Sequence, residues 1–204
     1  NPDLKWETTT GTNTGLDFGF FNQKLSGSID YYVKNTRDIL VLSPYAAVIG
    51  DGGSQWKNGA SVHTSGIDFM LEYQNNVGDL GYSVAANISH YKSEITRLPP
   101  EVVNAYPGNS EKTILGHSPN AYFGYIADGI FATQQEVNDH AVQPGKAIGR
   151  LRYSDLNGDG VVDDLDQDYI GSADPDFIYG VNIGVSYKHF DLSLFFQGVQ
   201  GINL

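Results

Sequence analysis

Six segments of this chain alternate apolar and polar residues with a period of two, and this pattern limits its possible folds more than any other feature. They cover residues 16–20, 25–34, 67–74, 82–89, 179–187 and 192–197. Because successive side chains of a β-strand point to opposite faces, each segment is predicted to be a strand. The charged residues within them, such as Asp30 and Glu72, alternate in phase with the small and polar residues. The sequence therefore predicts an all-β fold whose sheet has one apolar face and one wet face.

The connections between these segments fall into two classes. Residues 22–24, 75–81 and 188–190 are hairpin-sized joins, which predict antiparallel pairing. Long polar stretches run over about 38–64, over about 92–120 and from there to near Pro175. Short turns at one end of a sheet and long loops at the other are typical of a transmembrane β-barrel.

The last long stretch contains weaker signals of its own. Two further strands are expected at 121–131 and 148–153. Thr133 followed three residues later by Glu136 is a capping-box pattern, which predicts a short helix to about Ala141.

A soluble β-sandwich shows the same alternation, because its strands also turn one face toward a core. Tyr179 and Tyr187 favour the membrane fold. They lie eight residues apart on the apolar face, about 26 Å at roughly 3.3 Å per residue, or roughly 20 Å across a bilayer for a strand tilted by about 40°. Membrane interfaces favour tyrosine at both ends of such a face. We therefore expect an antiparallel transmembrane β-barrel segment, and a secreted, calcium-stabilised β-sandwich that binds carbohydrate is the alternative.

Composition excludes several functions. The chain has 12 Lys and Arg against 24 Asp and Glu, a net charge of −12, so it is not expected to bind nucleic acid through a basic face. It has no cysteine for a disulfide or a thiolate zinc site. Its five histidines are scattered and no catalytic motif is present, so we expect no enzymatic activity.

The stretch from Asp155 to Asp166 has the spacing of a calcium-binding loop. Side-chain oxygens fall at loop positions one, three and five, a glycine at six and a backbone carbonyl at seven. The predicted ligands are Asp155, Asn157, Asp159, the carbonyl of Val161, Asp163 and Asp166. Position twelve is aspartate rather than the usual glutamate, and the flanking helices of an EF-hand are missing. We predict a structural calcium ion that fixes a long loop, against the alternative of a solvated acidic loop.

Six blocks of sequence follow one another in an order that resembles a known family. They are NPDLKWE (1–7), GSIDYY (27–32), ADGIF (127–131), the calcium-like loop (155–166), PDFIYG (175–180) and FFQGVQG (195–201). Together they resemble the late barrel region of SusC/RagA-type TonB-dependent outer-membrane transporters. The resemblance spans nearly the whole chain and is most specific over residues 155–201.

The resemblance implies an arc of a plugged barrel of about 22 strands, in contact with lipid in the outer membrane of a Gram-negative bacterium. It also implies import of glycan or peptide nutrients, energy from a TonB complex, and a SusD-like surface lipoprotein as partner. Residues 1–204 are then expected to be a partial barrel domain of a longer protein, because the family's plug domain, TonB box and final strands are absent from this sequence. Residues 155–166 are expected to form an insert in one of the long extracellular loops.

Overall fold

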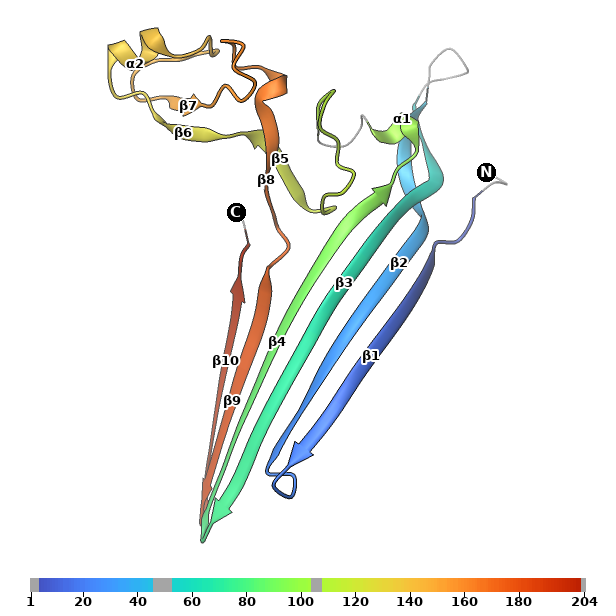
Figure 1. The fold of residues 1–204 in the computed structure, drawn as a ribbon, viewed down its shortest axis with the longest axis vertical. Helices are drawn as coiled ribbons and strands as arrows, with labels where there is room; N and C mark the ends of the chain where they lie inside the picture. The colour runs from blue at the N-terminus through green and yellow to red at the C-terminus, as the bar shows by residue number, and fades with distance from the viewer. Residues whose placement is uncertain (1–3, 46–52, 104–107, 203–204) are drawn as a thin grey trace.

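A single antiparallel sheet dominates the computed structural model, which describes residues 4–45, 53–103 and 108–202 (Figure 1). Its strands are β1 (Thr8–Phe20), β2 (Leu25–Tyr45), β3 (Gly53–Val77), β4 (Leu80–Arg97), β9 (Phe177–Tyr187) and β10 (Phe190–Gln200). They lie side by side in the order β1-β2-β3-β4-β9-β10. The predicted all-β, antiparallel segment is confirmed, and each of the six alternating segments lies within one of these strands.

The strands turn tightly at one end of the sheet, here called the turn end. The β3–β4 connection is the two-residue turn Gly78-Asp79, and Gly78 has a φ of 60°. Glycine adopts such a left-handed conformation at little cost, so the turn closes without strain. Residues 21–24 and Lys188-His189 make the other two turns, which confirms all three predicted joins.

At the opposite end, here called the loop end, the strands are longer than the sequence predicts. The stretch 38–64 was expected to be a loop, but its described part continues β2 to Tyr45 and begins β3 at Gly53. The register shifts between Thr36 and Ile39, where Asp38 has a φ of 57°. A β-bulge of this kind reverses the in-and-out alternation, so a search for period two loses the strand there.

Between β4 and β9 the chain leaves the sheet and forms a small insertion beyond the loop end (Figure 1). Its elements are α1 (Pro100–Val103), β5 (Ala121–Tyr125), β6 (Ala127–Ile130), α2 (Gln134–Asp139), β7 (Leu151–Tyr153), the 3₁₀ turn Asp164–Asp166 and β8 (Gln167–Ser172). The predicted helix is confirmed: the Thr133 hydroxyl accepts a hydrogen bond from the Glu136 N–H at 3.2 Å. No helix in the described part of the chain has the length and apolar character needed to cross a bilayer.

The buried hydrophobic residues lie outside the alternating segments. One cluster covers the loop end of β2–β4 and consists of Val41, Ala60, Ile95, Leu98, Val102 and Ile114. Inside the insertion, Phe131, Val137 and Val162 are buried. Among the described residues, no second layer of protein buries the apolar face of the sheet, so the alternative β-sandwich is wrong.

Candidate functional site

The register of the sheet aligns its apolar side chains into rows. Phe69 of β3 lies opposite Ile29 of β2 and Ile88 of β4. Directly opposite residues share a face of the sheet, and the row of Phe69 continues across all six strands. Two complete rows are Leu16-Ile29-Phe69-Ile88-Tyr179-Gly198 and Phe20-Leu25-Tyr73-Val84-Ile183-Leu194. We call the side that carries these rows the apolar face.

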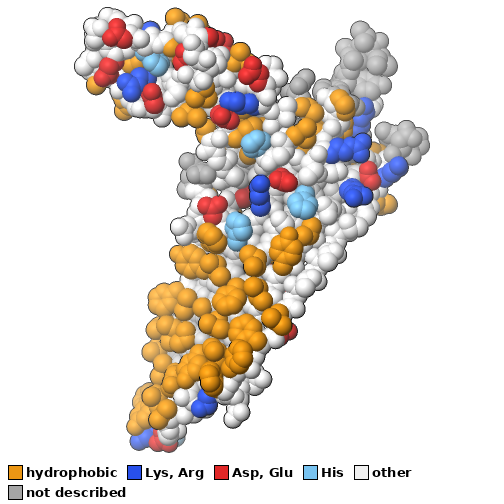
Figure 2. Space-filling model, in the orientation of Figure 1, with side chains coloured by type: hydrophobic (Ala, Val, Ile, Leu, Met, Phe, Trp, Pro, Cys, Tyr) orange, Lys and Arg blue, Asp and Glu red, His pale blue; other side chains and the backbone are white. Residues whose placement is uncertain are grey.

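The apolar face is a continuous band over the half of the sheet nearest the turn end (Figure 2). Along β9 it runs from Phe177 to Tyr187, eleven residues, whose ten steps of about 3.3 Å make about 33 Å along the strand. At a tilt of about 40° this corresponds to about 25 Å, the height of the apolar band of an outer-membrane barrel. Leu16 is 63% exposed and Phe196 is 58% exposed, so the described part of the protein leaves more than half of each residue uncovered.

The opposite face of the same strands is wet. Asp30 and Asp68 lie directly opposite each other there, and Glu72 lies four residues from Asp68 on the same strand face. Like charges in directly opposite positions destabilise a sheet unless water screens them. This face therefore suits a water-filled lumen rather than a second packed layer.

Two glycines on the apolar face each lie under an aromatic ring of the neighbouring strand. A Cβ added to Gly27 would lie 2.5 Å from the Phe18 ring, and one added to Gly198 would lie 2.3 Å from the Tyr179 ring. In each pair the two residues are directly opposite. The rings cover backbone that glycine would otherwise expose, which keeps the apolar face continuous.

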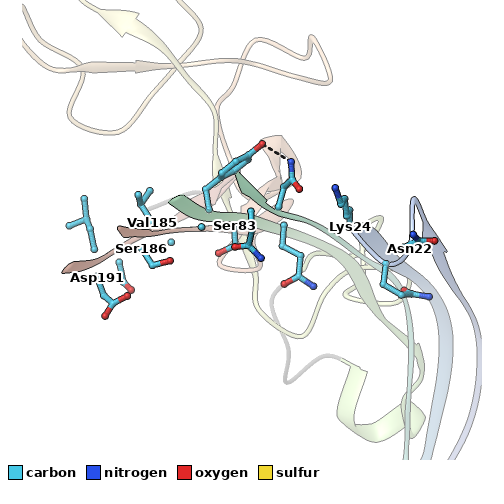
Figure 3. Close-up of a pocket in the computed structure, with 15 residues that line it drawn as sticks. Asn22, Lys24, Ser83, Val185, Ser186 and Asp191 are labelled. Carbon is cyan, nitrogen blue, oxygen red and sulfur yellow. Dashed lines mark hydrogen bonds between the residues drawn. The ribbon is translucent and has the colours of Figure 1, made fainter. Parts of the chain in front are cut away.

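A polar hollow of about 590 Å³ lies at the turn end of the sheet (Figure 3). Asn22, Lys24, Ser83, Ser186 and Asp191 are among the side chains that line it. These groups can donate and accept hydrogen bonds, but they include no histidine, thiol or pair of carboxylates. The hollow therefore fits a polar protein surface better than a reaction centre.

The six strands form an open arc, because β1 and β10 each have one long edge without a partner strand among the described residues. In lipid, unpaired backbone groups cost several kcal/mol each, by order of magnitude. An arc with an apolar face therefore needs further strands on both sides, as in a large barrel.

In the insertion, the loop predicted to bind calcium is closed by its own side chains. Asp155 accepts hydrogen bonds from the backbone N–H groups of Gly158 and Gly160, at 2.7 and 2.8 Å. Asp159 accepts one from the Val161 N–H at 2.8 Å. The structure thus brings the predicted residues into one compact turn, with their oxygens directed at backbone donors.

Asp166, at the twelfth position, is the most buried residue of this loop and has no exposed surface. Its carboxylate accepts hydrogen bonds from the backbone of Asp163 and Leu156, both at 2.8 Å, and of Asn157 at 3.3 Å. Burial raises the pKa of Asp166, but these donors outweigh it and hold the pKa below its ordinary value. Among the described residues, no three His, Asp or Glu side chains are grouped so that they could hold a metal ion.

The loop is held to the rest of the insertion on both sides. Val142 pairs with Val161 in an isolated parallel bridge, and the Val162 N–H donates to the Val142 carbonyl at 2.8 Å. Beyond the loop, Lys112 forms an ion pair with Asp168 at 3.0 Å, which lowers the pKa of Asp168. The acidic stretch is thus a folded part of the insertion.

The arc, its uncovered apolar band and its insertion have counterparts in known proteins. A family model described as "TonB dependent receptor-like, beta-barrel" matches residues 1–202. The chain belongs to this family. The family is one of transporters rather than enzymes, as expected from the sequence.

Relatives support the same assignment for this TonB-dependent receptor barrel. The chain is 31% identical to TonB-dependent receptor P3 of Formosa agariphila and 29% identical to TonB-dependent receptor SusC of Bacteroides thetaiotaomicron. The matches cover 98% and 95% of this chain, but 21% and 19% of those proteins. The chain therefore spans about a fifth of the length of these relatives.

Solved structures agree with the fold. The structure of the RagAB peptide transporter matches 98% of this chain, and 22% of its own chain, with a TM-score of 0.74 and 26% identity. The RagAB peptide importer in the "closed-closed" state matches with a TM-score of 0.71 and 25% identity. The predicted SusC/RagA-type barrel arc is confirmed.

One positioning residue was missed by the sequence analysis. Asn58 of β3 bonds the backbone of Lys5 through both ends of its side-chain amide. A lone asparagine in a polar stretch carries no sequence signal for this role. The neighbouring Gly59 has a φ of 144°, which shows that the strand is irregular at this point. The sequence alone does not reveal this irregularity.

Proposed function

We propose that this chain is part of the wall of an outer-membrane, TonB-dependent importer. The observation that carries the proposal is the apolar face, aligned across six strands and left uncovered by the described residues. Hydrocarbon is the medium that such a face needs, and its height fits a bilayer. The wet face then lines the lumen, and the insertion lies on the extracellular side.

The cargo is proposed to be glycan or peptide nutrients. The likeness to SusC and to the RagAB peptide importer supports this class. The same likeness supports a SusD-like surface lipoprotein as partner. Energy would come from a TonB complex acting through parts of the protein other than residues 1–204.

A structural calcium ion in the loop 155–166 is a second part of the proposal. Hard oxygen ligands suit calcium, and each carboxylate in the loop keeps lone pairs beyond those bonded to backbone N–H groups. Between Asp155 and Asp176 there are eight aspartates and no lysine or arginine. A divalent cation would neutralise part of this charge and fix the insertion. Asp155, Asn157, Asp159, Asp163 and Asp166 would supply side-chain oxygens, and Val161 its carbonyl.

The importer proposal is tested with the full-length protein in its own bacterium. Deleting the gene should abolish growth on the cognate glycan or peptide, and restoring it should recover growth only in cells with an intact TonB system. The protein should fractionate with the outer membrane and need detergent for extraction. A full-length protein that stays monomeric and soluble in plain buffer would contradict the proposal.

A further inference from the structure

The chain contains two Asn-Gly pairs, Asn58-Gly59 and Asn157-Gly158. In such a pair the backbone nitrogen of the glycine can attack the side-chain carbonyl carbon of the asparagine and close a cyclic imide. Asparagine is a thermolabile residue, and glycine favours this reaction because it has no Cβ to crowd the nitrogen. The fold gives the two pairs very different surroundings.

Asn157 folds back over its own backbone. Its Oδ1 accepts a hydrogen bond from the Asp159 N–H at 2.9 Å. An asparagine that bonds the N–H two residues further on lays its side chain over the peptide group in between. The carbonyl carbon of Asn157 therefore lies beside the Gly158 nitrogen. Asn157 and Gly158 are both exposed, so water reaches the pair.

The hydrogen bonds of this turn suit the charge changes of ring closure. Negative charge develops on Asn157 Oδ1 during the attack, and the Asp159 N–H is already directed at that oxygen. The Gly158 N–H donates to an oxygen of Asp155 at 2.7 Å, so a carboxylate lies where the proton must leave. The turn thus holds the nucleophile, the attacked carbonyl and a proton acceptor together.

Asn58 is held away from its glycine. Its Oδ1 accepts from the Lys5 N–H at 2.7 Å, and its Nδ2 donates to the carbonyls of Lys5 and Asp38 at 2.7 and 2.6 Å. All three bonds lead to segments distant in the sequence. They must break before the side chain can turn toward the Gly59 nitrogen.

We propose that Asn157 is a site of spontaneous deamidation in the folded protein. The Gly158 nitrogen forms a bond to the side-chain carbonyl carbon of Asn157 and gives its proton to Asp155. The carbon–nitrogen bond of the side-chain amide breaks, and ammonia leaves with that proton, returned through water. A water molecule then opens the cyclic imide at either of its carbonyl groups, and the product is aspartate or isoaspartate at position 157.

Either product changes the loop 155–166. Both add one negative charge to a stretch that already has eight aspartates and no lysine or arginine between Asp155 and Asp176. Isoaspartate also lengthens the backbone by one carbon, which displaces the Gly158 and Gly160 N–H groups from the Asp155 carboxylate that now accepts both. The reaction needs no metal ion and is independent of the importer proposal.

The test compares the two Asn-Gly pairs within one sample of the full-length protein. The protein is kept in neutral detergent solution with a chelator, and conversion of each amide to the acid is followed by peptide mapping with mass spectrometry. Ring closure breaks one hydrogen bond of Asn157, from Nδ2 to Asp159, and three of Asn58. Each broken bond slows the reaction by about fivefold, so Asn157 should convert at least about tenfold faster. Equal rates, or faster conversion at Asn58, overturn the proposal.

Synthetic peptides of residues 55–61 and 154–160 show whether the fold causes the difference. Without the fold the two pairs should convert at similar rates. If the peptides differ as much as the pairs do in the protein, the neighbouring residues are the cause and the proposal is overturned.

A pair of variants tests the proton acceptor. Asp155→Asn keeps an oxygen for the Gly158 N–H but cannot take its proton, so conversion at Asn157 should slow by at least about tenfold. The matched control Asp139→Asn removes a carboxylate of α2 outside the loop and should convert like the unchanged protein. Unaltered conversion in Asp155→Asn overturns the role given to Asp155.

Discussion

The side-chain amide of Asn58 forms the same pair of hydrogen bonds with the Lys5 backbone that the backbone of a neighbouring strand would form. The Lys5 N–H donates to Asn58 Oδ1 and Asn58 Nδ2 donates to the Lys5 carbonyl, both at 2.7 Å. Asn58 Nδ2 also donates to the Asp38 carbonyl at 2.6 Å, at the bulge in β2. One amide thus joins the segment before β1 to the irregular part of the β2–β3 hairpin.

Replacing Asn58 by alanine should release the segment before β1. The change removes hydrogen bonds to Lys5 and to Asp38, each contributing about 0.5–1.5 kcal/mol. Faster hydrogen exchange over residues 4–7, measured on the full-length protein by mass spectrometry, is the expected result. Asn58→Asp keeps the acceptor and loses the donor, so it should have an intermediate effect. Identical exchange in all three proteins would show that the amide does not hold this segment.

The two faces of β3 should respond oppositely to arginine. Leu71 lies in a middle row of the apolar face, so Leu71→Arg should cost about 2–4 kcal/mol of folding free energy in lipid. Met70, the preceding residue, points to the wet face opposite Ser28 and Asn87, and Met70→Arg should cost much less. Urea unfolding of the full-length protein in lipid vesicles measures both. Similar penalties at the two positions would refute the assignment of the faces.

Two glycines of the β1–β2 hairpin should differ sharply in their tolerance of alanine. A Cβ at Gly27 would lie 2.5 Å from the backbone oxygen of Met70 as well as from the Phe18 ring. Backbone cannot move aside as a side chain can, so Gly27→Ala should destabilise the sheet by about 1–3 kcal/mol. At Gly11 the nearest atoms are 3.7 Å away, and Gly11→Ala should be neutral or slightly stabilising. The same urea titration compares them, and equal midpoints would contradict the crowding at Gly27.

The sequence predicts the structure well wherever the two-residue alternation of apolar and polar side chains continues along a whole strand. In the half of the sheet near the turn end, every strand has one apolar face and one wet face. The position of Phe69 or Ile183 in the apolar-polar alternation therefore predicts directly on which face its side chain lies. The turns were predictable for the same reason, since glycine and polar residues interrupt the alternation there. The six predicted strands alone are compatible with a small closed barrel as well as with an arc of a larger one. The family resemblance is what favours the arc.

The loop end was less predictable because its backbone departs from regular pairing. The bulges near Asp38 and Ser61 change the phase of β2–β4, so strands there were read as loops. Asn58 acts through a partner 53 residues away, and local pattern contains no information on such a contact.

The calcium loop combines a predicted spacing with a turn that is already closed by hydrogen bonds. Asp159 accepts from the Val161 N–H, so truncation to alanine would disturb the turn with or without a metal ion. Asp159→Asn is the sharper change, because the amide oxygen can still accept this bond while the charge is lost. Asp139→Asn in α2 is the matched control, since its carboxylate bonds Gln135 outside the loop.

Calcium at about 100 times its dissociation constant should stabilise the insertion by about 2.7 kcal/mol, because an ion that binds the folded loop and not the unfolded chain shifts the folding equilibrium by this amount. Limited proteolysis of the full-length protein should then nick residues 155–166 faster after chelation, and added calcium should restore protection. Asp159→Asn should need much more calcium for the same protection, whereas Asp139→Asn should behave like the unchanged protein. Cleavage that is equally slow with chelator and with calcium would leave a solvated acidic loop, held by its own backbone donors, as the better description.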